Sequence, residues 1–331
     1  MTHPYEALPD ASFWRRVVAG VPGNAVDPVL AGKFRIGTGD RVATAGSCFT
    51  QHISRHLRDA GFTPFVTETA HPIAAQHAAE HGYGLFTARY GNLYTARQLL
   101  QLLQRAYGDF SPLDDIWPGT NGRFIDPFRP QVQPGGFASR SEFRVDRRQH
   151  FAAVRQAIET LDVLVFTLGL TETWTARADG AAYPICPGVA GGTFDAASHA
   201  FVNFGVTDVT ADLSAAIEFI RGRNPRARVI LTVSPVPLIA TMEPRSVLAS
   251  TTHSKARATR CRRGSGGAAW RRGLLPVLRD RHRPSYTGRL LRPGLAVRDR
   301  GRGGACHALV YAALHVRADC RGTAHDSLRK L

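Results

Sequence analysis

Residues 41–50, RVATAGSCFT, place the strongest constraint on the fold of this chain. A short apolar run leads to Gly46, Ser47 and Cys48, and residues 51–60 then follow a helical pattern. This order predicts a buried strand, a tight turn and a helix whose N-terminus faces whatever lies over the turn. Such a turn presents a hydroxyl or thiol to solvent, and the helix N-terminus favours negative charge. The segment is therefore a candidate position for an acyl-transfer nucleophile.

Alternating strand and helix patterns indicate the fold class. The expected strands are residues 41–46, 62–67, 162–167 and 227–233. The expected helices are residues 51–60, 95–107, 141–161 with Ser141 as the cap, and 207–223. These segments follow the strand and helix periodicities. The alternation predicts a three-layer α/β fold with a mostly parallel sheet, whose ligands bind beyond the carboxyl ends of the strands.

Irregular segments separate these elements. Residues 1–40, with scattered Pro and Gly, are expected to wrap over the surface. Residues 108–140 predict a long ordered loop, which at this length is usually functional. Residues 174–183 predict a hairpin-like insertion. We therefore expect one domain over residues 41–255, flanked by the N-terminal segment and by a tail over residues 256–331.

Five short motifs resemble one family in their order along the chain. They are residues 46–49 (GSCF), 88–100 (ARYGNLYTARQLL), 126–130 (DPFRP), 167–172 (TLGLTE) and 232–238 (TVSPVPL). The set is similar to the GSCFA family, with Thr50 where the family signature has alanine. The resemblance implies an SGNH-hydrolase-like (flavodoxin-like) fold. It also implies ester hydrolysis or acyl transfer on a carbohydrate ester or another small molecule, without a cofactor.

The resemblance also implies where the nucleophile lies. Aligned on the Gly-Asp-Ser block of SGNH hydrolases, Cys48 takes the place of the nucleophilic serine, and Ser47 offers a hydroxyl one position earlier. Ser47 would require a histidine base, whereas Cys48 would react as a thiolate, so both stay candidates. The Asp-x-x-His base motif of that superfamily does not occur in this sequence. A catalytically silent binding module is therefore a second hypothesis.

Candidates for stabilising the oxyanion follow other strands. Gly169 and Thr171 occupy the place of the Gly-x-Asn block of SGNH hydrolases, with threonine for asparagine. Asn92 could supply the missing amide. All three are catalytic candidates.

Three charged residues are candidates for binding substrate: Asp126, Arg129 and Glu172. Each fits equally well as a structural ion pair that holds a loop or a strand end. Arg89 and Tyr94 are interpreted as packing residues around a helix start.

The positive charge of the chain is concentrated at its C-terminal end. Residues 256–331 contain 17 arginines and one lysine against four aspartates, which is +14 of the formal net charge of +16. The same 76 residues hold no Glu, Gln, Asn, Ile, Phe or Met. Few folded domains have such a composition.

A displaced reading frame explains this change. Read one base later, codons for residues 274–280 permit Tyr-Phe-Pro-Ser-Tyr-Glu-Ile, which resembles a late strand of the GSCFA family. The same offset restores family-like stretches at residues 292–300 and 305–314. We therefore hypothesise a frameshift close to Lys255, after which the chain is disordered or misfolded. The alternative is an Arg-rich arm that binds nucleic acid, which we do not expect.

A further motif suggests another class of enzyme. Residues 77–81, HAAEH, fit the H-x-x-E-H pattern of inverted zinc peptidases. We favour a solvated helical face there and expect no metal site. The five cysteines form no C-x-x-C pair. Without a recognisable signal peptide or a long apolar run, the expectation is a cytoplasmic protein without a membrane partner.

Overall fold

A three-stranded parallel sheet forms the centre of the protein. The computed structural model describes residues 3–22, 26 and 34–264. The strands are β1 (Val42–Gly46), β4 (Val163–Leu168) and β8 (Arg228–Val233), in the order β1-β4-β8. Val42 pairs with Val163, and Val163 with Arg228. Every residue of β4 is buried, which explains its continuous apolar sequence. The predicted parallel α/β arrangement is confirmed.

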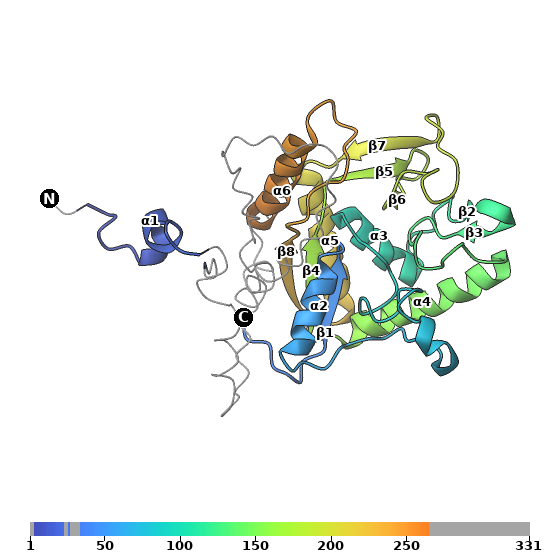
Figure 1. The fold of residues 1–331 in the computed structure, drawn as a ribbon, viewed down its shortest axis with the longest axis horizontal. Coiled ribbons are helices and arrows are strands. Elements are labelled where there is room, and N and C mark those ends of the chain that lie inside the picture. Colours follow the sequence, from blue (N-terminus) through green and yellow to red (C-terminus); the bar gives the residue numbers. More distant parts are fainter. Residues whose placement is uncertain (1–2, 23–25, 27–33, 265–331) are drawn as a thin grey trace.

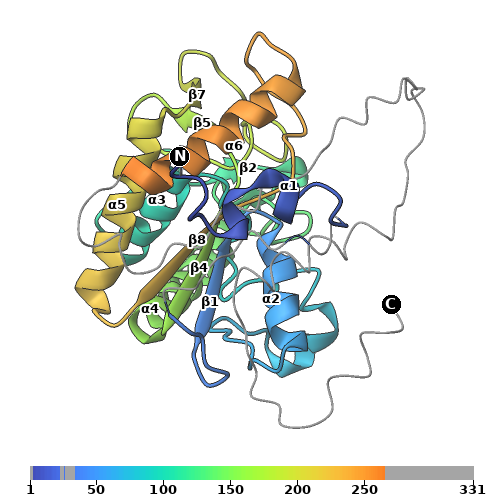
Figure 2. The same cartoon turned by 90° about the vertical axis from the view of Figure 1, so that its left-hand side faces the viewer.

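Helices cover both faces of this sheet (Figure 2). On one face lie α3 (Ala96–Tyr107), α4 (Arg140–Thr160) and α5 (Val206–Arg223), and on the other lies α2 (Thr50–Asp59). Alternate residues of each strand pack against the helices on the two faces of the sheet. Phe166 and Leu231 join the larger cluster with α3 and α5, whereas Val165 and Ile230 pack against α2. The alternation follows from the two-residue period of a strand.

Local capping fixes where two of these helices begin. Thr95 and Gln98 form a capping box at the start of α3, as the sequence pattern suggests. Helix α4 begins one residue earlier than predicted, because Ser139 is the cap. Its Oγ accepts the Glu142 N–H at 3.1 Å. The prediction of Ser141 as the cap is wrong, since its hydroxyl bonds instead to that of Ser139.

The strand predicted at residues 62–67 does not form. This segment is extended but joins no ladder, and the Thr67 N–H bonds to the Thr87 carbonyl at 2.8 Å. Nearby, the outer edge of β1 is closed by side chains. The Thr44 N–H donates to Thr87 Oγ1 at 3.0 Å, and the Tyr90 hydroxyl donates to the Thr44 carbonyl. The place expected for a strand is therefore taken by irregular chain.

The domain also contains two small antiparallel sheets among the described residues. One consists of β2 (Trp117–Pro118) and β3 (Phe124–Ile125), with the 3-10 helix η4 (Thr120–Gly122) between them, inside the long loop predicted at residues 108–140. The other has the order β6-β5-β7, formed by β5 (Glu172–Ala176), β6 (Ala182–Tyr183) and β7 (His199–Asn203). β5 and β6 confirm the predicted hairpin.

Helix α6 (Val247–Gly264) lies across the carboxyl ends of the central strands (Figure 2). Ala258 and Cys261 are buried in the main core. The helix passes Lys255 without a break, so the last turns belong to the packed domain. The predicted tail lies, from residue 265 on, outside the described residues.

The N-terminal residues lie beside the domain (Figure 1). They form η1 (Asp10–Ser12) and α1 (Trp14–Val17). Trp14 is 72% exposed. Another 3-10 helix, η3 (Pro72–His77), follows α2. Among the described residues, no helix is both long and apolar enough to cross a membrane.

The outer edge of β8 differs from that of β1. The N–H groups of Arg228 and Ser234 donate to the carbonyls of Asp162 and Leu168, on the β4 side. Those of Val229, Leu231 and Val233 therefore point away from β4. No strand pairs with that edge among the described residues. β8 is thus an unpaired edge strand in the part of the chain that the structure describes.

Candidate active site at the carboxyl end of β1

Gly46 determines the shape of the turn after β1. Its φ is +140°, and a Cβ atom there would lie 2.4 Å from the carbonyl oxygen of Thr167. Other residues would be strained and would also clash with backbone. Just beyond, the Thr50 N–H bonds to the Ser47 carbonyl at 2.8 Å, which begins the turn into α2. The predicted strand, turn and helix are therefore present.

The two nucleophile candidates differ in exposure. Ser47 is 2% exposed, and its Oγ has no hydrogen-bond partner among the described residues. Cys48 is a free, partly exposed cysteine. The backbone N–H groups of Cys48 and Phe49, at the N-terminus of α2, have no partner in the described part of the chain. The thiol, with two unoccupied donors beside it, is the better-presented nucleophile.

The loop before α3 is fastened against this turn. The Leu93 N–H donates to the Gly46 carbonyl at 2.8 Å, and the Tyr94 carbonyl accepts the N–H groups of Gly169 and Leu170, both at 2.9 Å. Three segments that are distant in sequence are thereby held together at the carboxyl end of the sheet.

Tyr94 is a site residue that the sequence analysis assigned to packing. Burial raises the pKa of its hydroxyl, the charge of Cys48 adds to the rise, and a hydrogen bond with Asn92 opposes it. The hydroxyl therefore stays protonated at neutral pH and can donate a hydrogen bond close to the thiol. The sequence feature that could have indicated this role is the position of Tyr94 between the candidate Asn92 and the start of α3.

The oxyanion candidates do not all meet at Cys48. The Gly169 N–H is engaged by Tyr94, and its carbonyl accepts a bond from Lys255 Nζ at 2.6 Å. Thr171 is fully buried, and its N–H donates to Ser254 Oγ at 2.9 Å. Asn92 is the candidate whose side chain faces a cavity. The amides of the other two are already satisfied.

A cavity of about 150 Å³ adjoins the turn. Gln51, in the first turn of α2, borders it together with Asn92, Tyr94, Arg129 and Gln131. Side-chain amides, a phenol, one guanidinium and the carboxylate-bearing Glu80 therefore border this cavity, whereas Cys48 does not line it. Glu172 does not border it. That carboxylate lies at the start of β5 and accepts the Thr241 hydroxyl at 2.8 Å.

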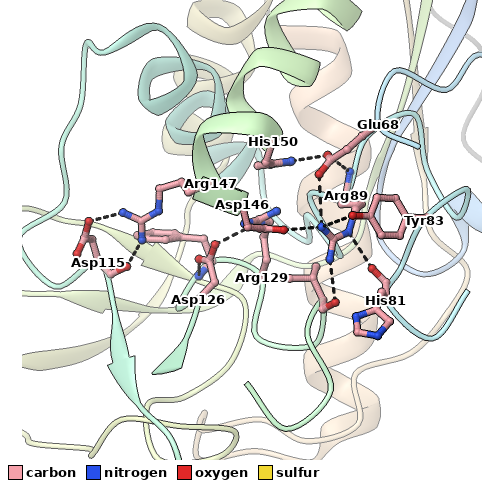
Figure 3. Close-up of polar contacts among 12 residues, drawn as sticks. Glu68, His81, Tyr83, Arg89, Asp115, Asp126, Arg129, Asp146, Arg147 and His150 are labelled. Carbon is pink, nitrogen blue, oxygen red and sulfur yellow. Dashed lines mark hydrogen bonds and ion pairs between the residues drawn. The ribbon is translucent and has the colours of Figure 1, made fainter. Parts of the chain in front are cut away.

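Arg129 reaches the cavity from a buried ion-pair network (Figure 3). Its side chain is 3% exposed. Nε bonds to Asp126 at 2.9 Å and Nη2 to Asp146 at 2.6 Å, whereas Nη1 has no partner among the described residues. The structure thus brings Arg129 to the site. Asp126, which does not border this cavity, holds Arg129 in place.

In this network, neighbouring positive groups outweigh the cost of burying the carboxylates. Burial raises the pKa of Asp126, but Arg129, Arg105 and Arg147 outweigh that effect and hold it well below its usual range. The pKa of Glu68 falls to about 2, because a hydrogen bond and the charge of His150, with help from Arg129, outweigh burial. Both carboxylates are ionised at neutral pH.

Two further residues, Arg89 and His150, extend the network (Figure 3). Arg89 bonds to Asp146 at 2.6 Å and lies 3.7 Å from Glu68, and His150 Nδ1 lies 2.7 Å from Glu68. Burial, with the charge of Arg129, lowers the pKa of His150, and the contact with Glu68 opposes this shift. Arg89, predicted as a packing residue, is a central member of this network.

The zinc-peptidase motif does not assemble. His77 ends a 3-10 helix, and His81 follows in a turn, so the two side chains do not share the face of an α-helix. His77 Nδ1 contacts Glu80 at 3.3 Å, and His81 Nδ1 contacts Gln133 at 3.0 Å. Within the described ranges, no group of three His, Cys, Asp or Glu side chains could hold a metal.

No general base contacts the thiol. Among the residues that the structure describes, Cys48 Sγ has no hydrogen bond to a histidine or a carboxylate. This agrees with the missing Asp-x-x-His motif.

Comparisons with known proteins give one result. The model described as GSCFA family matches residues 41–261. This match begins just before β1 and ends inside α6. No curated protein and no solved structure matched.

Proposed function

Since the chain belongs to the GSCFA family, we propose that it hydrolyses an ester, or transfers its acyl group, through a thioester on Cys48. The observation that carries this proposal is the difference in exposure between Cys48 and Ser47 at the turn. The Cys48 thiol is partly exposed at the N-terminus of α2, three residues before Gln51, which borders the cavity, whereas Ser47 is buried. An SGNH-hydrolase-like arrangement of the core belongs to the same proposal.

The residues divide the reaction between them. The Cys48 thiolate adds to the ester carbonyl carbon, and the carbonyl oxygen takes up the negative charge. The free N–H groups of Cys48 and Phe49, with the amide N–H of Asn92, hold that oxyanion. The C–O bond of the ester then breaks, and the leaving alcohol takes a proton from the Tyr94 hydroxyl or from water. Attack by water or a second alcohol on the thioester releases the acyl group and restores the thiol.

Acylation measured by mass spectrometry tests the proposal. The full chain is incubated with p-nitrophenyl acetate, and the acetylated peptide is identified. We expect one acetyl group on Cys48, retained in Ser47→Ala and absent in Cys48→Ala. Iodoacetamide should label the same cysteine, and a fluorophosphonate should label neither residue.

Two results would reject the proposal. Fluorophosphonate labelling of Ser47 would make the hydroxyl the nucleophile. Absence of acylation in a folded protein, shown by circular dichroism, would leave the catalytically silent binding module. A carbohydrate ester is the substrate class we propose.

A further inference from the structure

The peptide unit between Gly169 and Leu170, directly after β4, is held from both sides. Its carbonyl, that of Gly169, accepts a hydrogen bond from Lys255 Nζ of α6 at 2.6 Å. Its N–H, that of Leu170, donates to the Tyr94 carbonyl at 2.9 Å. A peptide unit is planar and rigid, so Lys255 is connected to the Tyr94 backbone through one stiff plane.

Gly169 also lies against the turn that carries the thiol. A Cβ atom at Gly169 would lie 3.0 Å from the Cβ of Ser47 and 3.2 Å from Cδ1 of the Tyr94 ring. The Gly169 N–H donates to the Tyr94 carbonyl as well, at 2.9 Å. A displacement of this peptide plane would therefore move the Tyr94 ring, the residue before Cys48, or both.

The Tyr94 hydroxyl belongs to the chemistry of the thiol. Burial raises the pKa of this hydroxyl, and the charge of Cys48 adds to the rise, which places the two groups close together. Lys255 is partly buried, and its bond to a carbonyl is charge-assisted, about twice as strong as a neutral one. We infer that Lys255 is a positioning residue for the reaction at Cys48: its ammonium group fixes the Gly169–Leu170 plane and thereby holds the Tyr94 hydroxyl beside the sulfur. This role rests on the proposed function, since Tyr94 acts on the same thiol.

Helix α6 supplies a matched control. Arg257 Nη1 bonds to Asn203 Oδ1 at 2.9 Å and to the Phe204 carbonyl at 3.1 Å, so it fastens the same helix to the end of β7. These bonds do not include the peptide plane that contacts Tyr94. Arg257→Met therefore removes a cation and its backbone contact from α6, and leaves the plane in place.

Alkylation of Cys48 by iodoacetamide, followed by mass spectrometry of the Cys48 peptide, tests the connection without ester chemistry. Tyr94→Phe should slow alkylation about fivefold, the usual effect of one hydrogen bond. Lys255→Met keeps the apolar stem, removes the ammonium and should give a similar loss, which Lys255→Arg should largely recover. The double variant should be no slower than Tyr94→Phe, because both changes remove the same contact to sulfur. Arg257→Met should react as the wild type does.

Leaving groups give a second measurement. p-Nitrophenolate departs without a proton, whereas the ethanol released from ethyl acetate needs one from Tyr94. Lys255→Met should therefore slow the hydrolysis of ethyl acetate about tenfold more than that of p-nitrophenyl acetate. A merely structural loss would slow both substrates equally.

The results separate the role of Lys255 from the proposed function. Unchanged alkylation in folded Lys255→Met, additive losses in the double variant, or an equal loss in Arg257→Met overturns the positioning role; circular dichroism checks the fold of each variant. If the wild type forms no acyl-enzyme, the proposed function fails, and the alkylation series still decides the role of Lys255. Acylation that is insensitive to Lys255→Met keeps the proposed function and removes the positioning role.

Discussion

Buried carboxylates are compensated on one side of this molecule and left partly unsatisfied on the other. Glu68 and Asp126, beside the segments that close β1, lie among arginines that hold both pKa values low. Glu172 and Asp212, near α6 and α5, have pKa values raised by burial despite hydrogen bonds from Thr241 and Arg97. One oxygen of each lacks a partner among the described residues.

The difference separates two halves of the matched region. The first half pairs the carboxylate oxygens of Glu68 and Asp126 and closes the edge of β1 with its own side chains. The second half leaves carboxylate oxygens and the edge of β8 without partners in the described part of the chain. The displaced frame near Lys255 stays a hypothesis, and the unpaired edge of β8 offers a place to test it.

The largest expected effect comes from breaking the compensated side. Arg129→Met removes a buried cation that bonds to both Asp126 and Asp146, and leaves Asp126 without an ion-pair contact and Asp146 with Arg89 alone. It should lower the free energy of unfolding by about 3–5 kcal/mol, measured by urea denaturation. A loss below about 1 kcal/mol would show that the network is not a stabilising unit.

Restoring the proposed frame should have the next largest effect. A protein translated one base later from about residue 256 would supply a strand for the free edge of β8. Pairing the N–H groups of Val229, Leu231 and Val233 at about 1 kcal/mol each predicts a gain of about 3 kcal/mol. The same urea experiment measures it, after the gene has been resequenced around codon 255. An intact frame, or a restored protein of unchanged stability, would contradict the hypothesis.

If the Arg-rich tail instead binds nucleic acid, deleting residues 265–331 should abolish salt-sensitive retention on immobilised DNA. The displaced-frame hypothesis predicts instead no specific nucleic-acid binding by the tail, so the full chain and the deletion variant should be retained alike.

Acid should affect the compensated side first. The pKa of Glu68 is lowered in the folded protein to about 2 from 4.5, so its contribution is full above about pH 4.5 and is lost as the pH falls toward 2. This loss amounts to about 2 kcal/mol by pH 3. Stability measured from pH 7 to pH 3 should fall, and Glu68→Gln should flatten that fall. An unchanged slope in the variant would show that Glu68 is not the group responsible.

The smallest effect is expected on the other side. Because burial raises the pKa of Glu172, its charged form is disfavoured, and Glu172→Gln should change stability by less than about 1 kcal/mol, with either no change or a gain. The matched change Asp126→Asn should destabilise clearly. Equal losses in these two variants would remove the contrast between the halves.

The sequence predicted the core because its signals were local. The apolar run of β4, the helical periodicity of α3 and the glycine before Ser47 each identify an element from a few neighbouring residues. The strand predicted at residues 62–67 was wrong, because its apolar pattern gave no information about which segment would lie beside β1. The edge of a sheet is decided by tertiary contacts.

The same limit applies to the site. The turn at Cys48 and the cavity position of Arg129 follow from short motifs, whereas the burial of Ser47 and the engagement of Thr171 by α6 depend on packing. Tyr94 was missed because its closeness to Cys48 arises from a backbone bond between distant segments. Its sequence neighbours indicate a helix start and nothing more.

In this turn, Gly46 determines the backbone geometry, and a different residue carries the thiol. The absence of a side chain at one position sets the geometry, while the proposed nucleophile is carried two residues later on a backbone that is already in place. An engineer could therefore exchange sulfur for oxygen with Cys48→Ser and leave the scaffold untouched. The same freedom is open to natural divergence, so relatives with unlike chemistry could share this bend as long as they keep its glycine.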